Sequence, residues 1–383
     1  MVSFRIRTKE KIKAEITFLS NFSWDTPNVL ELLCETASFK SFKINHFSKP
    51  SSIFKISRNK SKEYSTPNIN ILELKNFSIK FSHIPIIKEI QNRYLLHQIN
   101  KASRLDHLKV LIYNNLDSLS DLGKKLKDNF DVLIYLCADY AKLDKNFLQN
   151  CELADCIFII PNSMHDTLNN RFSDKKLILW PQPVSSLTTK NLTSKQTNKL
   201  NEILSKIPKP RLIYAGQGKE RLNSIIYNKV ASSFPKLSLI SFGSKKFHRR
   251  SNVFELKSIS KEEMLYFISQ CQVGFMPYDI SDPHNFHCVP LKLFDYFSVG
   301  IPVVSSKLIN LKEYDDLLYM CNSEREFESA IIKSLQESNS TESRTKRKQV
   351  YRYHSSLERS NQFETIVYDL LRPTSPQIGR PIL

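Results

Sequence analysis

The sequence predicts an α/β protein built from two domains, each with a doubly wound parallel sheet. Short apolar runs alternate with helical patterns through most of the 383 residues, which is typical of parallel sheets covered by helices. Over residues 185–210 the composition changes to Ser, Thr, Lys, Asn and Pro, and a second alternation begins at residue 211. Because a chain of this length is too long for one ordinary core, we interpret 1–184 and 211–350 as two domains joined by the linker 185–210.

The first domain contains five apolar runs that we interpret as strands. These runs cover residues 16–19, 110–113, 132–136, 156–160 and 177–180. After the first run, Thr26 is suited to the N-cap of a helix and Pro27 to its first turn. Residues 40–70 are basic and rich in serine, and we expect them to form a surface excursion rather than a part of the sheet.

The second domain repeats the pattern. Its predicted strands cover residues 212–215, 237–242, 253–256, 273–276 and 302–305. The linker before it can hold a short helix at 199–207. After it, we expect a C-terminal helix over 351–372 that can cross back to the first domain, and a disordered tail over 373–383. In such sheets ligands bind outside the carboxyl ends of the strands, which predicts a site between the domains.

The composition excludes a disordered chain, because 41% of the residues are hydrophobic and 11% are aromatic. The net charge is +18, and residues 1–110 carry 19 Lys and Arg against 9 Asp and Glu. Such a field attracts nucleic acid, anionic lipid or anionic substrates, although a bias toward lysine with solvated charges explains part of it. Since no nucleic-acid-binding motif accompanies the charge, an anionic membrane surface is the favoured partner and nucleic acid is not.

Two further features indicate a cytoplasmic protein. Its positive charge would attract it to the inner face of a membrane. The N-terminal residues lack the apolar stretch of a secretory signal, and no run reaches the length of a membrane-spanning helix. The seven cysteines form no metal-like spacing, and several lie in apolar runs. We therefore expect buried free thiols in a reducing compartment.

The segment 273–306 holds the most informative pattern: a strand, a polar loop, a helix that starts at Pro290 and ends at Gly300, and another strand. Lys292 and Asp295 stand three residues apart on this helix and therefore share a face. The lysine and the free N–H groups of the helix suit phosphate, and the carboxylate suits ribose hydroxyls. The simpler alternative is a solvated ion pair within the helix.

This segment resembles the nucleotide-sugar signature of the group-one glycosyltransferases, which have the GT-B fold of two Rossmann-like domains with parallel sheets facing across a cleft. The matching residues are Pro290, Lys292, Asp295, Tyr296, Gly300, Pro302, Val303 and Val304. The resemblance implies donor contacts from Pro290, Leu291, Lys292 and Asp295, with Asp295 in place of the usual glutamate. His287 stands where many retaining members carry another glutamate, so it becomes a candidate donor contact and the retaining mechanism is not implied.

A second stretch, 212–223, resembles the strand and glycine turn that open the C-terminal domain of these enzymes. Gly216 and Gly218 would let the backbone approach a diphosphate, and Lys219 or Arg221 would supply charge. An ordinary strand–helix turn is the alternative interpretation.

The first domain resembles bacterial surface-polysaccharide members of the family more loosely, in the segments 22–27, 134–140 and 152–155. An acceptor hydroxyl needs a base from this domain, and we predict Asp139 first and Asp25 second. Either carboxylate can instead cap a helix. His83, His284 and His287 are weaker candidates for the base, and the last two could contact the donor instead.

The sequence thus predicts a glycosyltransferase with a nucleotide-sugar donor and a glycan or lipid-linked acceptor, in surface-polysaccharide or glycolipid synthesis. We expect no cofactor and no metal, because no Asp-x-Asp motif occurs in the chain. Three alternatives stay open. The first two are a nucleotide-sugar epimerase and a phosphorylase, although no lysine Schiff-base motif supports a phosphorylase. The third is a non-catalytic scaffold or nucleic-acid-binding protein with a degenerate form of the fold.

Overall fold

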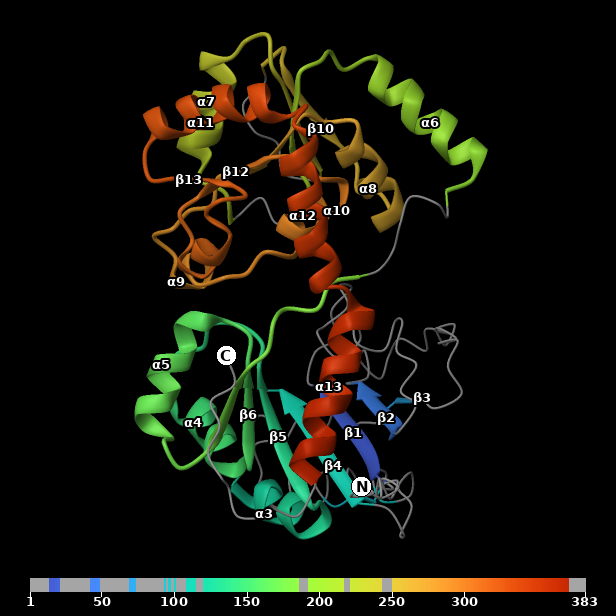
Figure 1. Cartoon of the computed structure of the whole chain (residues 1–383), viewed down its shortest axis with the longest axis vertical. Helices are drawn as coiled ribbons and strands as arrows, with labels where there is room; N and C mark the ends of the chain where they lie inside the picture. Colours follow the sequence, from blue (N-terminus) through green and yellow to red (C-terminus); the bar gives the residue numbers. More distant parts are fainter. Residues whose placement is uncertain are drawn as a thin grey trace, which may run out of the picture.

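The computed structural model of the chain consists of two α/β domains, one above the other in Figure 1. It describes residues 14–20, 42–48, 69–73, 93, 96–97, 100, 108–114, 120–185, 192–216, 221–242 and 250–371. Both domains contain a sheet in which every described strand pair is parallel. The predicted fold class is therefore confirmed.

The first sheet has seven strands in the order β3-β2-β1-β4-β5-β6-β7. The strands are β1 (Ala14–Ser20), β2 (Phe42–Ser48), β3 (Ile69–Glu73), β4 (Leu108–Asn114), β5 (Val132–Cys137), β6 (Cys156–Ile159) and β7 (Lys176–Leu179). Helices α3 (Ser120–Asn129), α4 (Lys145–Leu153) and α5 (Asn162–Arg171) connect the last four strands. This alternation of strands and helices is typical of parallel sheets.

The interpretation of residues 40–70 as a surface excursion was wrong. β2 lies within that range and pairs along its whole length with β1, from Phe42 beside Ala14 to Ser48 beside Ser20. β3 begins at Ile69 and pairs with the other side of β2. The overall basic composition of the range concealed the apolar residues of these two short strands. A strand at this position is selected by pairing with β1, a contact that lies outside any local sequence window.

The second sheet has six strands in the order β10-β9-β8-β11-β12-β13. The strands are β8 (Arg211–Tyr214), β9 (Ser238–Phe242), β10 (Val253–Leu256), β11 (Val273–Met276), β12 (Val303–Ser306) and β13 (Tyr319–Cys321). The helices and turns around it are α7 (Ser224–Ser233), α8 (Lys261–Ser269), α9 (Pro283–Phe286), α10 (Leu291–Val299), the 3-10 turn η3 (Ile309–Tyr314) and α11 (Glu324–Glu337). All five predicted strands are present, within one residue at each end.

The linker helix is longer than expected. Helix α6 spans Ser194–Ser205, whereas the apolar pattern predicted 199–207. It begins earlier because Thr193 and Gln196 form a reciprocal capping box that satisfies two of the free N–H groups at the helix start. The exposed first turns carry no apolar signal, so the periodicity alone placed the start too late.

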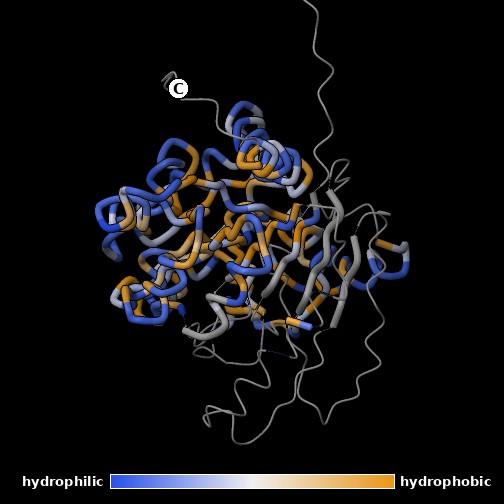
Figure 2. The backbone as a smooth tube through the Cα atoms, turned by 90° about the horizontal axis from the view of Figure 1, so that it is seen from below, coloured by the Kyte–Doolittle hydropathy of each residue, from blue (hydrophilic) through white to orange (hydrophobic). Residues whose placement is uncertain are grey.

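The inner strands of both sheets are buried on two sides, as parallel sheets require. In the described part of the chain, β5, β6, β8, β9, β11 and β12 consist almost entirely of buried residues. Figure 2 shows hydrophobic residues gathered along the inner strands and hydrophilic ones on the surrounding segments. Six cysteines are buried free thiols, as predicted, and Cys34 lies outside the described residues.

The C-terminal helices connect the two domains. Helix α12 (Thr341–Tyr353) packs against α10, and α13 (Ser356–Leu371) returns to the first domain (Figure 1), where Phe363 and Val367 join the core under Trp180. Between the two helices, Ser356 N–H donates to the Val184 carbonyl over 2.9 Å, and Val184 N–H donates to His354 O over 2.9 Å. The chain thus crosses between the domains at two adjacent, hydrogen-bonded segments.

His354 lies at this double crossing. Its Nδ1 is 2.9 Å from the Gln182 carbonyl and its Nε2 is 3.0 Å from the Tyr314 hydroxyl. Burial lowers the pKa of the ring to about 4, so the ring is neutral at pH 7, with Nδ1 donating and Nε2 accepting. The crossing is therefore held by a neutral polar network rather than by ion pairs.

Candidate functional site

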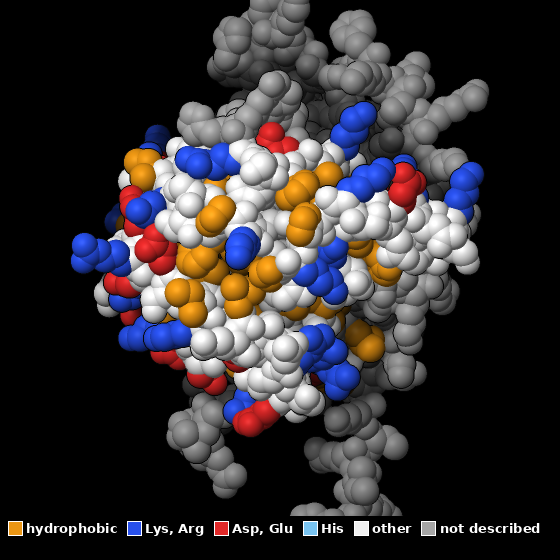
Figure 3. Space-filling model, turned by 90° about the horizontal axis from the view of Figure 1, so that it is seen from above, with side chains coloured by type: hydrophobic (Ala, Val, Ile, Leu, Met, Phe, Trp, Pro, Cys, Tyr) orange, Lys and Arg blue, Asp and Glu red, His pale blue; other side chains and the backbone are white. Residues whose placement is uncertain are grey.

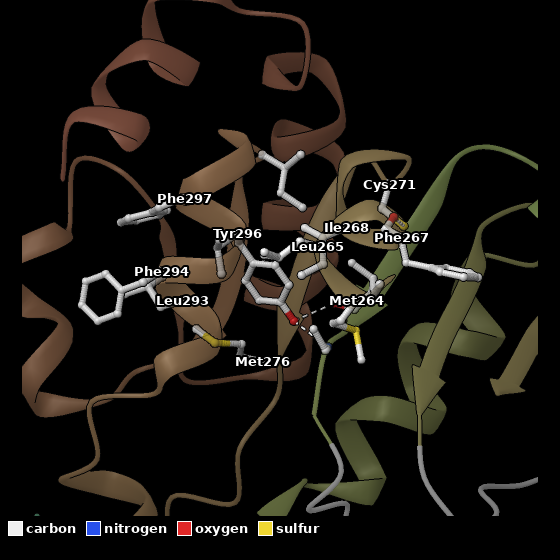
Figure 4. Packing of buried hydrophobic residues seen from close by; sticks show 14 of the residues in the cluster. Met264, Leu265, Phe267, Ile268, Cys271, Met276, Leu293, Phe294, Tyr296 and Phe297 are labelled. Carbon is white, nitrogen blue, oxygen red and sulfur yellow. Dashed lines mark hydrogen bonds between the residues drawn. The ribbon is translucent and has the colours of Figure 1, made fainter. Parts of the chain in front are cut away.

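Helix α10 carries the predicted donor residues. Pro290 is its N-cap residue and has no side-chain cap, so the first N–H groups of the helix are not satisfied by a capping side chain. At its other end Gly300 adopts φ 83°, and a Cβ there would lie 3.0 Å from the Arg344 carbonyl oxygen. The inner face of α10, with Leu293, Phe294 and Phe297, is buried in the core shown in Figure 4. The N-terminus of the helix is thus held in place by its buried face.

Tyr296 fixes α10 against the end of β8. Its hydroxyl accepts a hydrogen bond from Ala215 N–H over 2.8 Å and donates one to the Ile213 carbonyl over 2.9 Å (dashed lines in Figure 4). Its ring lies against Gly274, where a Cβ would come within 2.6 Å of it. The helix and the turn after β8 therefore have a fixed relation to each other.

Lys292 points from the first turn of α10 between two tyrosines. Its Nζ donates to the Tyr278 hydroxyl over 2.6 Å and to the Tyr214 hydroxyl over 3.1 Å, and lies 4.9 and 4.4 Å from the centres of their rings. Burial lowers the pKa of this lysine to about 8. Among the described residues no carboxylate lies within ion-pair distance of its Nζ. A partly buried ammonium held by neutral groups is suited to receive an anion.

Gly216 is packed directly against this lysine. A Cβ at Gly216 would lie 2.8 Å from both Cε and Nζ of Lys292 and 2.9 Å from Cζ of Tyr214. The glycine, two residues beyond the end of β8, thus leaves the room in which the lysine side chain lies. The predicted approach of the Gly216 backbone to a diphosphate stays a prediction, because the close neighbours of the glycine here are side chains of Lys292 and Tyr214.

Asp295 has a different partner from the one that its spacing predicted. Both of its carboxylate oxygens lie 2.6 Å from Nζ of Lys261, the first residue of α8. The ion pair between Lys292 and Asp295 that we considered as an alternative is therefore not formed. The two side chains share a helix face, but each is held by a residue of a different element.

The first domain places Asp139 opposite these groups. Asp139 follows β5 by two residues, at the end of the first sheet that points toward the second domain (Figure 1). Although its side chain retains exposure, desolvation by its surroundings raises the pKa of the carboxyl, and the nearby charges of Arg221 and His284 oppose this rise. The thiol of Cys288 feels the charges of Lys292, Arg221 and Asp139 together. Three of the predicted residues, one from the first domain and two from the second, thus act on the same thiol.

His287 contacts the first domain directly. Its ring stacks on Tyr140 with centroids 4.3 Å apart, and its Nδ1 lies 2.8 Å from Oγ of Ser163. Asn310 donates from Nδ2 to Ser163 Oγ over 3.0 Å, and Ser163 N–H donates back to its Oδ1 over 2.8 Å. Burial lowers the pKa of His287, so the ring is neutral at pH 7. His287 thus serves as a contact between the domains in this state.

Sequence reasoning missed Tyr140, Ser163, Asn310 and Lys261. Tyr140 ends the segment 134–140, which resembles family members, and the other three belong to no recognisable motif. Each acquires its partner only through the arrangement of elements far apart in the chain. An open pocket of about 410 Å³ lies beside the Ser163–Asn310 contact and contains none of the predicted site residues. Its lining residues are Asn162, Ser163, Ile309, Asn310, Lys312 and Glu313.

The remaining predicted residues are only partly described. Asp25, Gly218, Lys219 and His83 lie outside the described residues. Arg221 is exposed, and its carbonyl accepts from Asp279 N–H over 2.9 Å, which attaches the start of α7 to the loop after β11. Leu291 is the first residue of α10, and 37% of it is exposed.

The described residues contain no cluster of three or more His, Cys, Asp or Glu suited to hold a metal ion. They also contain no helix long and apolar enough to span a membrane. On the face of the second domain in Figure 3, basic side chains are scattered among acidic, neutral and hydrophobic ones rather than gathered in one patch.

The sequence matches no protein-family model and no curated protein. Solved structures of the same fold cover nearly the whole chain. A glycosyltransferase from Rickettsia africae has a TM-score of 0.70 at 9% identity and covers 95% of this chain and 100% of its own. A trehalose-6-phosphate structure from E. coli, bound with UDP-2-fluoro glucose, has a TM-score of 0.67 at 10% identity, with 94% and 100% covered. A sucrose-phosphate synthase from Thermosynechococcus elongatus has a TM-score of 0.62 at 13% identity, with 94% and 99% covered. The chain therefore has the GT-B fold.

Proposed function

We propose that this chain is a glycosyltransferase that moves a sugar from a nucleotide-sugar donor to a hydroxyl acceptor. The observation that supports this most is the Lys292 ammonium, which is partly buried, held by the hydroxyls of Tyr214 and Tyr278, and not neutralised by a described carboxylate. It lies at the uncapped N-terminus of α10. An oxyanion placed there would meet a cation and free N–H groups together. One neighbour of the same fold is bound with UDP-2-fluoro glucose, which agrees with such a ligand.

Transfer breaks the bond between the sugar and the terminal phosphate of the donor, so negative charge builds up on the leaving diphosphate. Lys292 and the N-terminus of α10 would stabilise that charge, with Arg221 nearby. Because these groups are held before the ligand arrives, they lose little freedom when it binds.

On the acceptor side, Asp139 is the proposed base. A carboxylate that removes a proton from a hydroxyl works better when its pKa is raised, and desolvation raises the pKa of Asp139. The positive charges of Arg221 and His284 act in the opposite direction and lower the pKa of this carboxyl. Desolvation, the larger effect, thus favours a carboxylate that is more basic than an exposed one.

The acceptor we propose is a glycan or lipid-linked sugar of surface-polysaccharide or glycolipid synthesis, reached at the cytoplasmic face of an anionic membrane. The excess positive charge in residues 1–110 supports this, because cationic segments are attracted to anionic lipid. The protein should co-sediment with vesicles that contain phosphatidylserine and be released as salt increases. Absence of sedimentation at low salt would contradict the membrane part of the proposal.

The donor site is tested by thermal denaturation with UDP-, GDP-, ADP-, CMP- and dTDP-sugars. A ligand that binds only the folded state stabilises it by about 2.7 kcal/mol at one hundred times its Kd. We expect stabilisation by one class of nucleotide, lost in Lys292→Ala and Asp295→Ala. Lys206→Ala is the matched control, because Lys206 lies exposed on the linker and pairs only with Glu202.

Failure to bind any of these donors by well-folded protein would contradict the proposal and favour a scaffold with a degenerate fold. Binding followed by isomerisation of the sugar nucleotide without an acceptor would identify an epimerase instead. Product analysis by NMR distinguishes that outcome from transfer.

A further inference from the structure

Asn285 joins three segments at the edge of the proposed donor site. It lies in the short helix α9, between β11 and α10, and only 2% of it is exposed. Its Nδ2 donates to the Asp279 carbonyl over 2.9 Å and to the Arg221 carbonyl over 3.3 Å. Asp279 N–H donates to the same Arg221 carbonyl over 2.9 Å. One side chain thus connects α9, the loop after β11 and the turn before α7.

The two contacts fix the orientation of the Asn285 amide, because the opposite orientation would place its oxygen against two carbonyl oxygens. In this orientation Oδ1 is buried and has no hydrogen-bond partner among the described residues. A buried acceptor without a partner lowers the stability of the fold. An apolar side chain of similar size would avoid that cost, so packing alone does not explain an asparagine here.

The Arg221 carbonyl belongs to a short backbone pairing between the turn and the loop. Leu222 pairs with Tyr278 in an isolated antiparallel bridge. The Tyr278 hydroxyl in turn accepts from Nζ of Lys292 over 2.6 Å. The Asn285 amide connects this pairing to α9 and thus holds the backbone of Arg221 in a defined place relative to Lys292.

The charge of Arg221 acts on groups of both domains. Burial is the main cause of the lowered pKa of Lys292, and the charge of Arg221 lowers it further. Desolvation raises the pKa of Asp139, whereas the charges of Arg221 and His284 lower it. His284 is the residue before Asn285 in α9. Arg221 and His284 therefore both lie in segments that Asn285 joins.

We propose that Asn285 is a positioning residue of the donor site, which holds the turn at Arg221 against α9 and keeps this positive charge close to Lys292. The inference rests on the proposed function for the purpose of the two cations. Like charges repel each other, and the hydrogen bonds of Asn285 offset that repulsion before a ligand binds. A diphosphate that arrives at α10 then meets both charges already in place.

The first test measures the pKa of Lys292 in the free protein, from the pH dependence of its labelling by an amine-reactive reagent, followed by mass spectrometry. Asn285→Leu keeps the approximate size of the side chain and removes its N–H donors. The pKa of Lys292 should rise from about 8 by roughly half a pH unit or more, because a repelling charge moves away. Three other groups that act on Lys292 are unaltered by this change: Cys288, Asp295 and Lys261.

Nucleotide affinity is the second readout. Calorimetry with UDP, GDP, ADP and CDP should show that Asn285→Leu binds the preferred nucleotide about three- to tenfold more weakly than the parent. Arg221→Met should raise the pKa of Lys292 by itself, and adding Asn285→Leu to it should give no further rise. Asn285→Ala provides the same comparison if Asn285→Leu does not fold.

Asn252→Leu is the matched control. Asn252 is a buried asparagine of the same domain, next to the amino end of β10, and its Nδ2 also donates to backbone carbonyls. The acceptors are Ala231, Phe234 and Leu237. Loss of this amide should lower thermal stability but leave the pKa of Lys292 and the nucleotide affinity unchanged.

If the Asn285 variants lower only thermal stability, as the control does, Asn285 is purely structural and the inference is wrong. It is also wrong if Arg221→Met leaves the pKa of Lys292 unchanged, or if the rise caused by Asn285→Leu persists in the double variant. A rise in the parent background that is absent from the double variant supports the positioning role. Should the parent then bind no nucleotide, the proposed function fails while the positioning of Arg221 stands.

Discussion

On the second-domain side of the interface, Lys292 and Gly216 are held by α10, whose inner face is buried and whose Tyr296 is hydrogen-bonded to the end of β8. On the first-domain side, Asp139 lies in a segment beyond β5, and the neighbouring Tyr140 has its ring contacts with His284 and His287 of the other domain. The donor side is therefore complete within its own domain, whereas the acceptor side depends on the approach of the second domain. Because of this difference, we expect variants on the donor side and variants on the acceptor side to have separate effects.

The largest expected effect is on the acceptor side. Asp139→Asn removes the proposed base, and kcat should fall by roughly 10²–10⁴-fold, the usual contribution of a general base. Affinity for the nucleotide should stay unchanged, because the donor side does not need this residue. Steady-state kinetics and calorimetry measure the two quantities separately. The exposed Asp174→Asn is the control, and loss of nucleotide binding in Asp139→Asn would show that the two sides are not independent.

Gly216→Ala tests the donor side alone. The added methyl group would lie 2.8 Å from Nζ of Lys292, and the lysine would have to leave its place against Tyr278. We expect nucleotide affinity to fall by about tenfold or more, the cost of one displaced charge-assisted contact. Thermal stability should fall as well, because the methyl group would also lie 2.9 Å from Cζ of the buried Tyr214 ring. Gly123→Ala is the control, because its methyl group would meet Leu153 at 3.2 Å in the first domain. Nucleotide affinity should fall in Gly216→Ala and stay unchanged in Gly123→Ala.

The pH dependence of binding should report on Lys292. Its pKa is lowered to about 8 without ligand, and a bound anion favours the protonated form. Above pH 8 binding must therefore take up a proton, and affinity should fall by up to about tenfold per pH unit. In the free protein the unfolded lysine binds more protons between pH 8 and its ordinary value of about 10.5, so this residue makes stability rise with pH in that range. Calorimetry in two buffers of different ionisation enthalpy measures the proton uptake, which Lys292→Ala should abolish.

The smallest expected effect is at the contact between the domains. Ser163→Ala removes the hydroxyl that lies between His287 and Asn310. The loss of about 1 kcal/mol should raise KM for the acceptor a few-fold and leave nucleotide affinity unchanged. Steady-state kinetics with a varied acceptor measures it, with Ser232→Ala on α7 as a control far from the interface. A larger effect on the nucleotide than on the acceptor would contradict the assignment of the two sides.

Local patterns were sufficient for most of the fold. Five of the six strands of the second sheet follow from short-range apolar periodicity, and β13 was missed. The start of α10 at Pro290 and its end at Gly300 follow from cap chemistry, and the structure agrees with both. β2 was missed because its few apolar residues lie in a basic stretch, and only pairing with β1 selects the strand. Helix α6 was predicted too short because its first turns are polar.

The sequence alone determined which side chains share a face of α10, since helical spacing sets that directly. It could not determine their partners. Lys292 turned out to lie between Tyr214 and Tyr278, and Asp295 against Lys261, because those contacts depend on how α8, β8 and β11 are placed around the helix. The joining of Ser163 and Asn310 across 147 residues likewise depends on the arrangement of the two domains. The spacing of residues along the chain determines the direction in which their side chains point from one helix or strand. Only the packing of helices and strands determines which residues those side chains contact.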